Sequence, residues 1–123
     1  MGVSIDAIEN HFGKRVPSAY APYLSTSPEM LRDDGLLLYD GDCIVERNDT
    51  LGAQEYVNEF LAVGDDSGGS LVVVRFDDPS GRPFLIDGGA LVPNMPPSLL
   101  KPLAASWAEW ERLGFPLPGS SGA

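Results

Sequence analysis

The spacing of apolar residues at the start of the chain predicts a helix. Ile5, Ile8 and Phe12 recur at intervals that place them on one face of a helix. Ser4 is a residue type that caps the beginnings of helices, and Gly13 is the type that commonly follows a helix end. We therefore expect a short amphipathic helix between these two residues.

From residue 16 to residue 56, prolines and turn residues interrupt the pattern. The three prolines of segment 16–35 divide it into one or two brief helices and a turn at 28–31. The apolar run LLLY at 36–39 predicts a strand that ends in an Asp-Gly turn. The polar segment 44–56 predicts a short helix with few apolar residues.

Three apolar runs of strand length fill the middle of the chain. They are EFLAVG at 59–64, SLVVVRF at 70–76 and PFLIDGG at 83–89, and the connections DDSGG and DDPSGR are rich in turn residues. Short connections of this kind favour antiparallel pairing in a meander. Because the middle run is apolar at almost every position, we expect it to be buried on both faces of the sheet.

The last apolar pattern predicts a second amphipathic helix near the end of the chain. Leu103, Trp107 and Trp110 lie at helical spacing, so we expect the two tryptophans in the core rather than at a stacking site. Pro102 suits the first turn of such a helix, and Gly114 suits its end.

This order of elements predicts an α+β protein. We expect a central antiparallel β-meander with N-terminal and C-terminal helices packed on it. A chain of 123 residues is long enough to bury a core without disulfides or metal, so we expect one domain over residues 1–114. The segment 115–123 is rich in Pro, Gly and Ser and is expected to be a flexible C-terminal tail.

Charge and cysteine content restrict the classes of function. The chain has 18 acidic and 8 basic residues and a net charge of −10, so we expect it to repel the phosphate backbone of nucleic acids. Its single cysteine, Cys43, cannot form an internal disulfide, which is typical of the cytoplasm. No stretch has the pattern of a signal peptide or the length of a membrane span, so we expect a cytoplasmic protein without membrane contact.

The stretch Asp66-Ser67-Gly68-Gly69 matches part of the sequence around the nucleophile of trypsin-like serine proteases. A catalytic serine needs a base, and the only imidazole of the chain is His11 in the predicted first helix. Asp65 also stands where close approach of backbone and substrate requires glycine. We therefore expect that Ser67 is not a nucleophile, and Cys43 likewise has no base assigned to it by the sequence.

Carboxylates gather at the ends of the predicted strands. Asp65, Asp66 and Asp87 belong to strand ends that a hairpin brings together, and Mg²⁺ and Ca²⁺ bind oxygen ligands of this kind. Their spacing matches no metal motif, and aspartate is common in turns because it hydrogen-bonds the local backbone. We expect turn residues with no metal and no other cofactor. A metal-dependent or small-molecule-binding enzyme based on these three carboxylates is the alternative.

Several motifs follow one another in an order that is more specific than any one of them. They are Pro17-Ser18-Ala19-Tyr20, Glu46-Arg47-Asn48, Tyr56, the run from Phe60 to Gly69, and the run from Phe84 to Gly89. In this order the chain resembles the SUKH superfamily, which comprises Smi/Knr-like immunity and cell-wall-regulator proteins, and the match spans about residues 3–113, nearly the whole chain.

The resemblance implies a SUKH-like α+β fold and a protein-binding role without catalysis. Many bacterial members look like immunity proteins that neutralise a toxin, and many such toxins are nucleases with basic clefts that suit an acidic partner. We expect the contact to involve Asp65, Asp66 and Ser67, joined by Glu46 and Arg47.

Five glycines of the motifs are expected to shape turns rather than to contribute binding energy. They are Gly64, Gly68, Gly69, Gly88 and Gly89. A structural or adaptor subunit of a larger assembly, including a homo-oligomer of this chain, is a further alternative.

Overall fold

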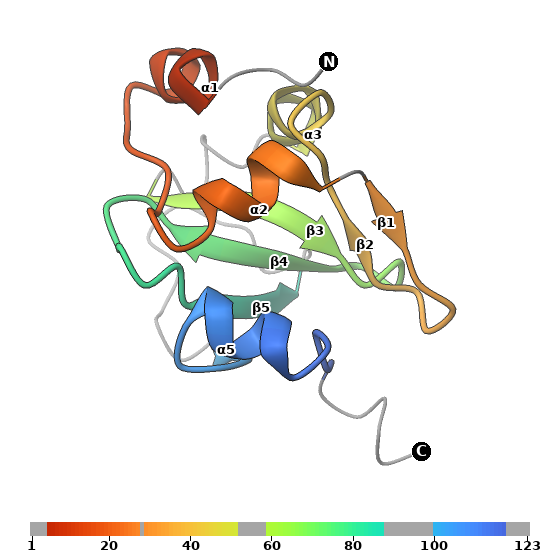
Figure 1. Cartoon of the computed structure of the whole chain (residues 1–123). Helices are drawn as coiled ribbons and strands as arrows, with labels where there is room; N and C mark the ends of the chain where they lie inside the picture. Colours follow the sequence, from red (N-terminus) through yellow and green to blue (C-terminus); the bar gives the residue numbers. More distant parts are fainter. Residues whose placement is uncertain (1–4, 28, 52–58, 88–99, 118–123) are drawn as a thin grey trace.

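A computed structural model of the chain describes residues 5–27, 29–51, 59–87 and 100–117. Within these residues, four helices surround a six-stranded sheet (Figure 1). The helices are α1 (Ile5–Phe12), α2 (Ala21–Thr26), α3 (Ile44–Leu51) and α5 (Trp107–Arg112). The strands are β1 (Met30–Leu31), β2 (Leu37–Leu38), β3 (Phe60–Asp65), β4 (Ser70–Arg75), β5 (Pro83–Asp87) and β6 (Lys101–Pro102).

The sheet is a meander in which each strand pairs with its neighbour in the chain. The order is β1-β2-β3-β4-β5-β6, and all five pairings are antiparallel. This confirms the predicted α+β class with a central antiparallel sheet. The three predicted central runs are β3, β4 and β5, and the predicted strand at 36–39 contains the shorter β2.

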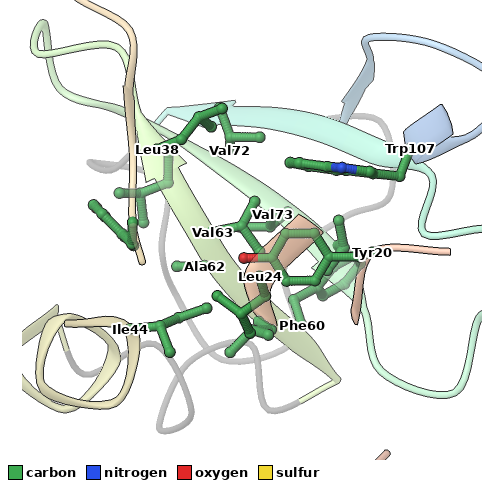
Figure 2. Close-up of a cluster of buried hydrophobic side chains, with 14 of the residues drawn as sticks. Tyr20, Leu24, Leu38, Ile44, Phe60, Ala62, Val63, Val72, Val73 and Trp107 are labelled. Atoms are coloured by element: carbon green, nitrogen blue, oxygen red, sulfur yellow. The ribbon is translucent and has the colours of Figure 1, made fainter. Parts of the chain in front are cut away.

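The core is centred on β3 and β4. Residues 71–74 of β4 are all buried, and because side chains alternate along a strand, both faces of the sheet are covered there. Figure 2 shows Leu24 and Ile44 beside Val63 and Val73 of the two central strands. Burial of this continuous apolar layer is the main stabilising contribution to the fold.

Aromatic side chains connect the C-terminal helix to α2. The Tyr20 ring lies edge-on to the Trp107 ring at a centroid distance of 4.5 Å, and Trp107 in turn contacts Trp110 at 5.3 Å. Both tryptophans are fully buried, which confirms that they belong to the core. Figure 2 shows Tyr20 and Trp107 side by side above the central strands.

Asn48 joins α3 to a bulge in β3. β2 pairs with β3 only at Gly64 and Asp65, so Ala62 has no β2 partner on its outer side, and the pairing of β3 with β4 shifts between Ala62 and Gly64. The side chain of Asn48 supplies that partner: its Oδ1 accepts from Ala62 N at 2.9 Å, and its Nδ2 donates to Ala62 O at 2.8 Å. This side chain is fully buried, so it substitutes for a missing strand.

The C-terminal helix begins later than the apolar spacing predicts. Ser106 is its N-cap and accepts from Glu109 N through its hydroxyl, so α5 starts at Trp107. Pro102 was predicted in the first turn of this helix but lies in β6, paired with Phe84 of β5. The reason is that proline is also tolerated on an edge strand, which local spacing cannot distinguish.

The predicted tail begins too early. Phe115 contacts Tyr23, Trp107 and Trp110, and Leu117 is only 7% exposed. Apolar contact with the aromatic cluster therefore extends the packed region to residue 117. The rest of the predicted tail lies outside the described residues, as do Gly88 and Gly89.

Met30 and Leu31 form an edge strand, although the sequence predicts a turn there. Both pair with β2, Met30 with Leu38 and Leu31 with Leu37. A strand of two residues has too few positions to show an alternating pattern. It forms because β2 provides a backbone with which it can pair.

Candidate functional site

The Asp65–Gly69 connection between β3 and β4 is a turn held by its own carboxylates. Asp66 Oδ1 accepts from Gly68 N at 2.8 Å and from Ser70 N at 2.9 Å. Asp65 Oδ1 accepts from Ser67 N at 2.9 Å. Aspartate stabilises turns in this way, which confirms the predicted turn. Two carboxylates are thus fixed in position on adjacent residues.

The predicted turn glycines have different roles. Gly69 has a φ of +103°, a left-handed conformation that glycine adopts without strain. Gly64, by contrast, is not a turn residue: it lies in β3 and pairs with Leu38. The two aspartates that follow Gly64 make the sequence look like a turn. In the structure, Gly64 is needed because a Cβ would collide with β2.

Ser67 connects the turn to the β1–β2 hairpin. Its hydroxyl donates to Gly35 O at 2.6 Å, and its own φ is +61°. Gly35 has a φ of +97°, and a Cβ there would lie 2.7 Å from Asp66 O. Three predicted contact residues are therefore in one rigid corner, formed by two turns that are distant in sequence.

Tyr39 connects this corner to α3 and was not identified from the sequence. Its hydroxyl donates to Asp65 Oδ2 at 2.8 Å, and burial together with this carboxylate raises the pKa of Tyr39 above its usual range. The Arg47 guanidinium lies 5.5 Å from the centre of the Tyr39 ring. Arg47 is also 4.0 Å from the Glu29 carboxylate. The structure thus links Arg47 to Asp65 through one aromatic ring.

Glu46 is exposed on α3, next to Arg47. Among the described residues, no recorded hydrogen bond or ion pair joins Glu46 to the Asp65–Gly69 turn. The predicted set therefore divides into a fixed corner, an arginine joined to it through Tyr39, and one separate carboxylate on the same helix.

Negative charge is concentrated around this corner. Segments 29–49 and 65–66 hold half of the 18 acidic residues of the chain but only two of its 8 basic residues, Arg32 and Arg47. These segments form β1, β2, α3 and the end of β3, which adjoin one another (Figure 1). We call the carboxylates of these segments the acidic surface; they are Glu29, Asp33, Asp34, Asp40, Asp42, Glu46, Asp49, Asp65 and Asp66.

The other end of β4 has a different charge. Lys14 and Arg75 line a hollow of about 420 Å³ there, together with Asp77 and Asp78. Arg75 is paired with Glu59 at 2.8 Å. With Glu59, this hollow has two cations against three carboxylates, whereas the acidic surface has two arginines against nine carboxylates. The balance of charge therefore differs between the two ends of β4.

Cys43 lies on the acidic surface, and its surroundings make it a poor nucleophile. A hydrogen bond with the Asp40 carboxylate, burial and the charges of Asp40 and Glu29 raise the pKa of the Cys43 thiol to about 11. Catalytic cysteines need the opposite shift, because the thiolate is the reactive form.

This pKa predicts slow alkylation of Cys43. At pH 8 the thiolate fraction of Cys43 in the folded chain is about a hundredfold below that of an ordinary cysteine. A more basic thiolate is also a stronger nucleophile, which offsets about tenfold of this loss in rate. Iodoacetamide should therefore react with the folded chain about tenfold more slowly than with the urea-unfolded chain. Mass spectrometry of timed samples measures the rate. Asp40→Asn should restore much of the reactivity. Equal rates in the folded and unfolded chain would contradict the assignment.

His11 and Ser67 each contact a different partner. His11 Nε2 lies 3.2 Å from Asp49 Oδ1 at an exposed site, and the Ser67 hydroxyl donates to a backbone carbonyl instead. Each group therefore has a partner that does not serve proton transfer between them.

The backbones of the three residues of the alternative enzyme hypothesis, Asp65, Asp66 and Asp87, lie at the same end of the sheet. Asp87 pairs in the backbone with Ser70, whose N–H is bound by Asp66. Within the residues that the structure describes, no group of three or more His, Cys, Asp or Glu side chains is arranged to hold a metal ion. The hydrogen bonds of Asp65 and Asp66 go to turn N–H groups and to Tyr39.

Comparisons with known proteins do not assign the chain to a group. No protein-family model matches it, and no curated protein matches it either. In the described part of the chain, every helix is too short or too polar to cross a bilayer.

Proposed function

We propose that this chain is a non-catalytic protein-binding domain, an immunity protein that binds and neutralises a cognate toxin with a basic surface. The observation that carries the proposal is the acidic surface, whose nine carboxylates include Asp65 and Asp66 of the fixed corner and seven more on the adjoining segments. The proposed site of action is the cytoplasm. Of the toxin classes, nucleases fit best, because their clefts bind phosphate and are therefore basic.

Electrostatic steering and rigidity of the acidic corner both favour binding of a basic partner. Concentrated charge speeds the encounter with an oppositely charged partner, and groups already fixed in the free protein lose little conformational entropy on binding. Asp65 and Asp66 satisfy both conditions, because each carboxylate is partly exposed and is already held by backbone N–H groups of the turn. The resemblance to the SUKH superfamily supports the same class of function.

Co-expression with the product of the neighbouring gene tests the proposal. We expect a complex that survives purification and a loss of the toxicity that the partner shows alone. Absence of both would contradict the immunity role. A complex without any toxicity of the partner would favour the adaptor alternative instead.

The acidic corner can be tested with a matched pair of variants. Asp65→Asn/Asp66→Asn removes two charges but keeps the Oδ1 acceptors of the turn, so association should slow by about tenfold at low salt. Asp77→Asn/Asp78→Asn makes the same change at the other end of β4 and should alter the rate much less. Stopped-flow mixing with the purified partner measures both rates. An equal effect of the two pairs would show that only net charge matters.

A further inference from the structure

The two edges of the sheet differ in how well they resist pairing with another chain. At one edge, β6 consists of Lys101 and Pro102; proline lacks an N–H, and lysine is a residue that protects edges by its charge. At the other edge, β1 consists of Met30 and Leu31, which have neither property. One edge is therefore protected by its own residues and the other is open.

The open edge presents the backbone of Leu31. Arg32 N donates to Leu36 O at 2.8 Å, so Arg32 faces β2, and the alternation of an antiparallel pair turns the N–H and C=O of Leu31 away from β2. Its side chain is 70% exposed. Within the described residues, no hydrogen bond is recorded for either backbone group of Leu31.

The charges beside this edge are negative. Glu29 and Asp33 are exposed on either side of β1. Two guanidiniums lie near these charges, and both are directed to groups of their own chain: Arg32 pairs with Asp34 at 2.6 Å and donates to the carbonyls of Gly114 and Phe115, and Arg47 lies 4.0 Å from the Glu29 carboxylate. A basic segment that approaches β1 therefore meets carboxylates, and the two guanidiniums beside them are already paired.

We propose that β1 is a docking edge, to which an extended basic segment of the partner adds as a seventh strand of the sheet. The Leu31 N–H and C=O bind the backbone of that segment, its apolar side chain covers Leu31, and its lysines or arginines face Glu29 and Asp33. This inference rests on the proposed function and specifies how the acidic surface holds its partner. A second copy of this chain fits less well, because two such edges would bring their carboxylates together.

A peptide probe tests the inference. We would titrate the whole chain with an acetylated and amidated peptide of alternating lysine and valine, and compare it with the same peptide N-methylated on alternate residues. The unmodified peptide at saturation should slow hydrogen exchange of the Leu31 amide by about tenfold or more. The methylated peptide keeps the charge but lacks the N–H groups, so its affinity should be about tenfold lower.

A variant addresses the same groups from the side of the protein. Leu31→Pro removes the outward N–H but leaves the hydrogen bond from Arg32 N to Leu36 O in place, and it should weaken peptide binding by about tenfold. Leu31→Ala is the control: it keeps the N–H, so the bound peptide should still protect the amide of residue 31 from hydrogen exchange. If Leu31→Pro does not fold, the comparison of the unmodified and N-methylated peptides on the wild-type chain still tests whether the backbone of β1 binds the peptide.

Any of three peptide results would overturn the inference: equal binding of both peptides, unchanged exchange at Leu31, or no binding of the unmodified peptide. Dimerisation through β1, seen by light scattering of the wild type and abolished by Leu31→Pro, would overturn it in favour of a second copy. None of these results affects the co-expression test. If the partner forms a complex that depends on Asp65 and Asp66 while Leu31 exchange stays unchanged, the proposed function stands and only the docking edge is wrong.

Discussion

Replacing Asn48 with leucine is expected to lower the free energy of unfolding by about 3–4 kcal/mol, because two buried backbone groups lose their partners at about 1–3 kcal/mol each. Leucine has nearly the shape of asparagine, so the change removes hydrogen bonds without leaving a large cavity. Ala62 N and Ala62 O would then be unpaired in the fully buried interface between α3 and β3. Ordinary domains have only about 5–15 kcal/mol of stability in total, so this is a large share.

Urea unfolding followed by tryptophan fluorescence measures this loss, because Trp107 and Trp110 are fully buried in the native state. Thr50→Leu is the matched control: it places leucine on the same helix at an exposed position and should change stability by no more than about 0.5 kcal/mol. A loss below about 1 kcal/mol for Asn48→Leu would mean that water or a backbone shift replaces the side chain.

The second large effect is expected from Gly64→Ala, which should cost about 3 kcal/mol through overpacking. A Cβ on Gly64 would collide with the carbonyl oxygen of Leu37 and lie 2.9 Å from Leu38 Cδ2. The carbonyl cannot move away easily, because β2 is hydrogen-bonded to β3 at this point. The strain therefore falls on the pairing that holds Tyr39 beside Asp65.

Gly68→Ala provides the control, since both glycines belong to the same motif. Its Cβ would lie 3.5 Å from Asp66 Oδ1, an ordinary van der Waals contact, and its φ is not left-handed. The change should therefore be nearly neutral in thermal and urea unfolding. A similar cost at both positions would contradict the packing argument for Gly64.

The central strands and the acidic turn could be predicted because their signals are local. The β4 run is apolar over consecutive residues, and the hydrogen bonds of Asp65 and Asp66 reach only two to four residues along the chain. Chemistry of this kind is visible in a short stretch of sequence, and the turn formed where it was expected.

The parts that could not be predicted depend on contacts between distant segments. Asn48 belongs to a polar helix, and its role arises because β2 has no residue that pairs with Ala62, which no local pattern shows. Tyr39 and Gly35 enter the corner only because β2 pairs with β3. The same holds for Gly64, which resembles a turn glycine in sequence but is a close-packing glycine in space.

The hydrogen bonds of Arg32 have a consequence for how the protein is made. They join the β1–β2 hairpin to carbonyls that lie 82 and 83 residues further along the chain. During synthesis on the ribosome, Arg32 therefore cannot bind these carbonyls until residues 114 and 115 have emerged. The hairpin edge acquires this anchoring late, so a nascent chain is expected to engage a partner at this edge only after that point in translation.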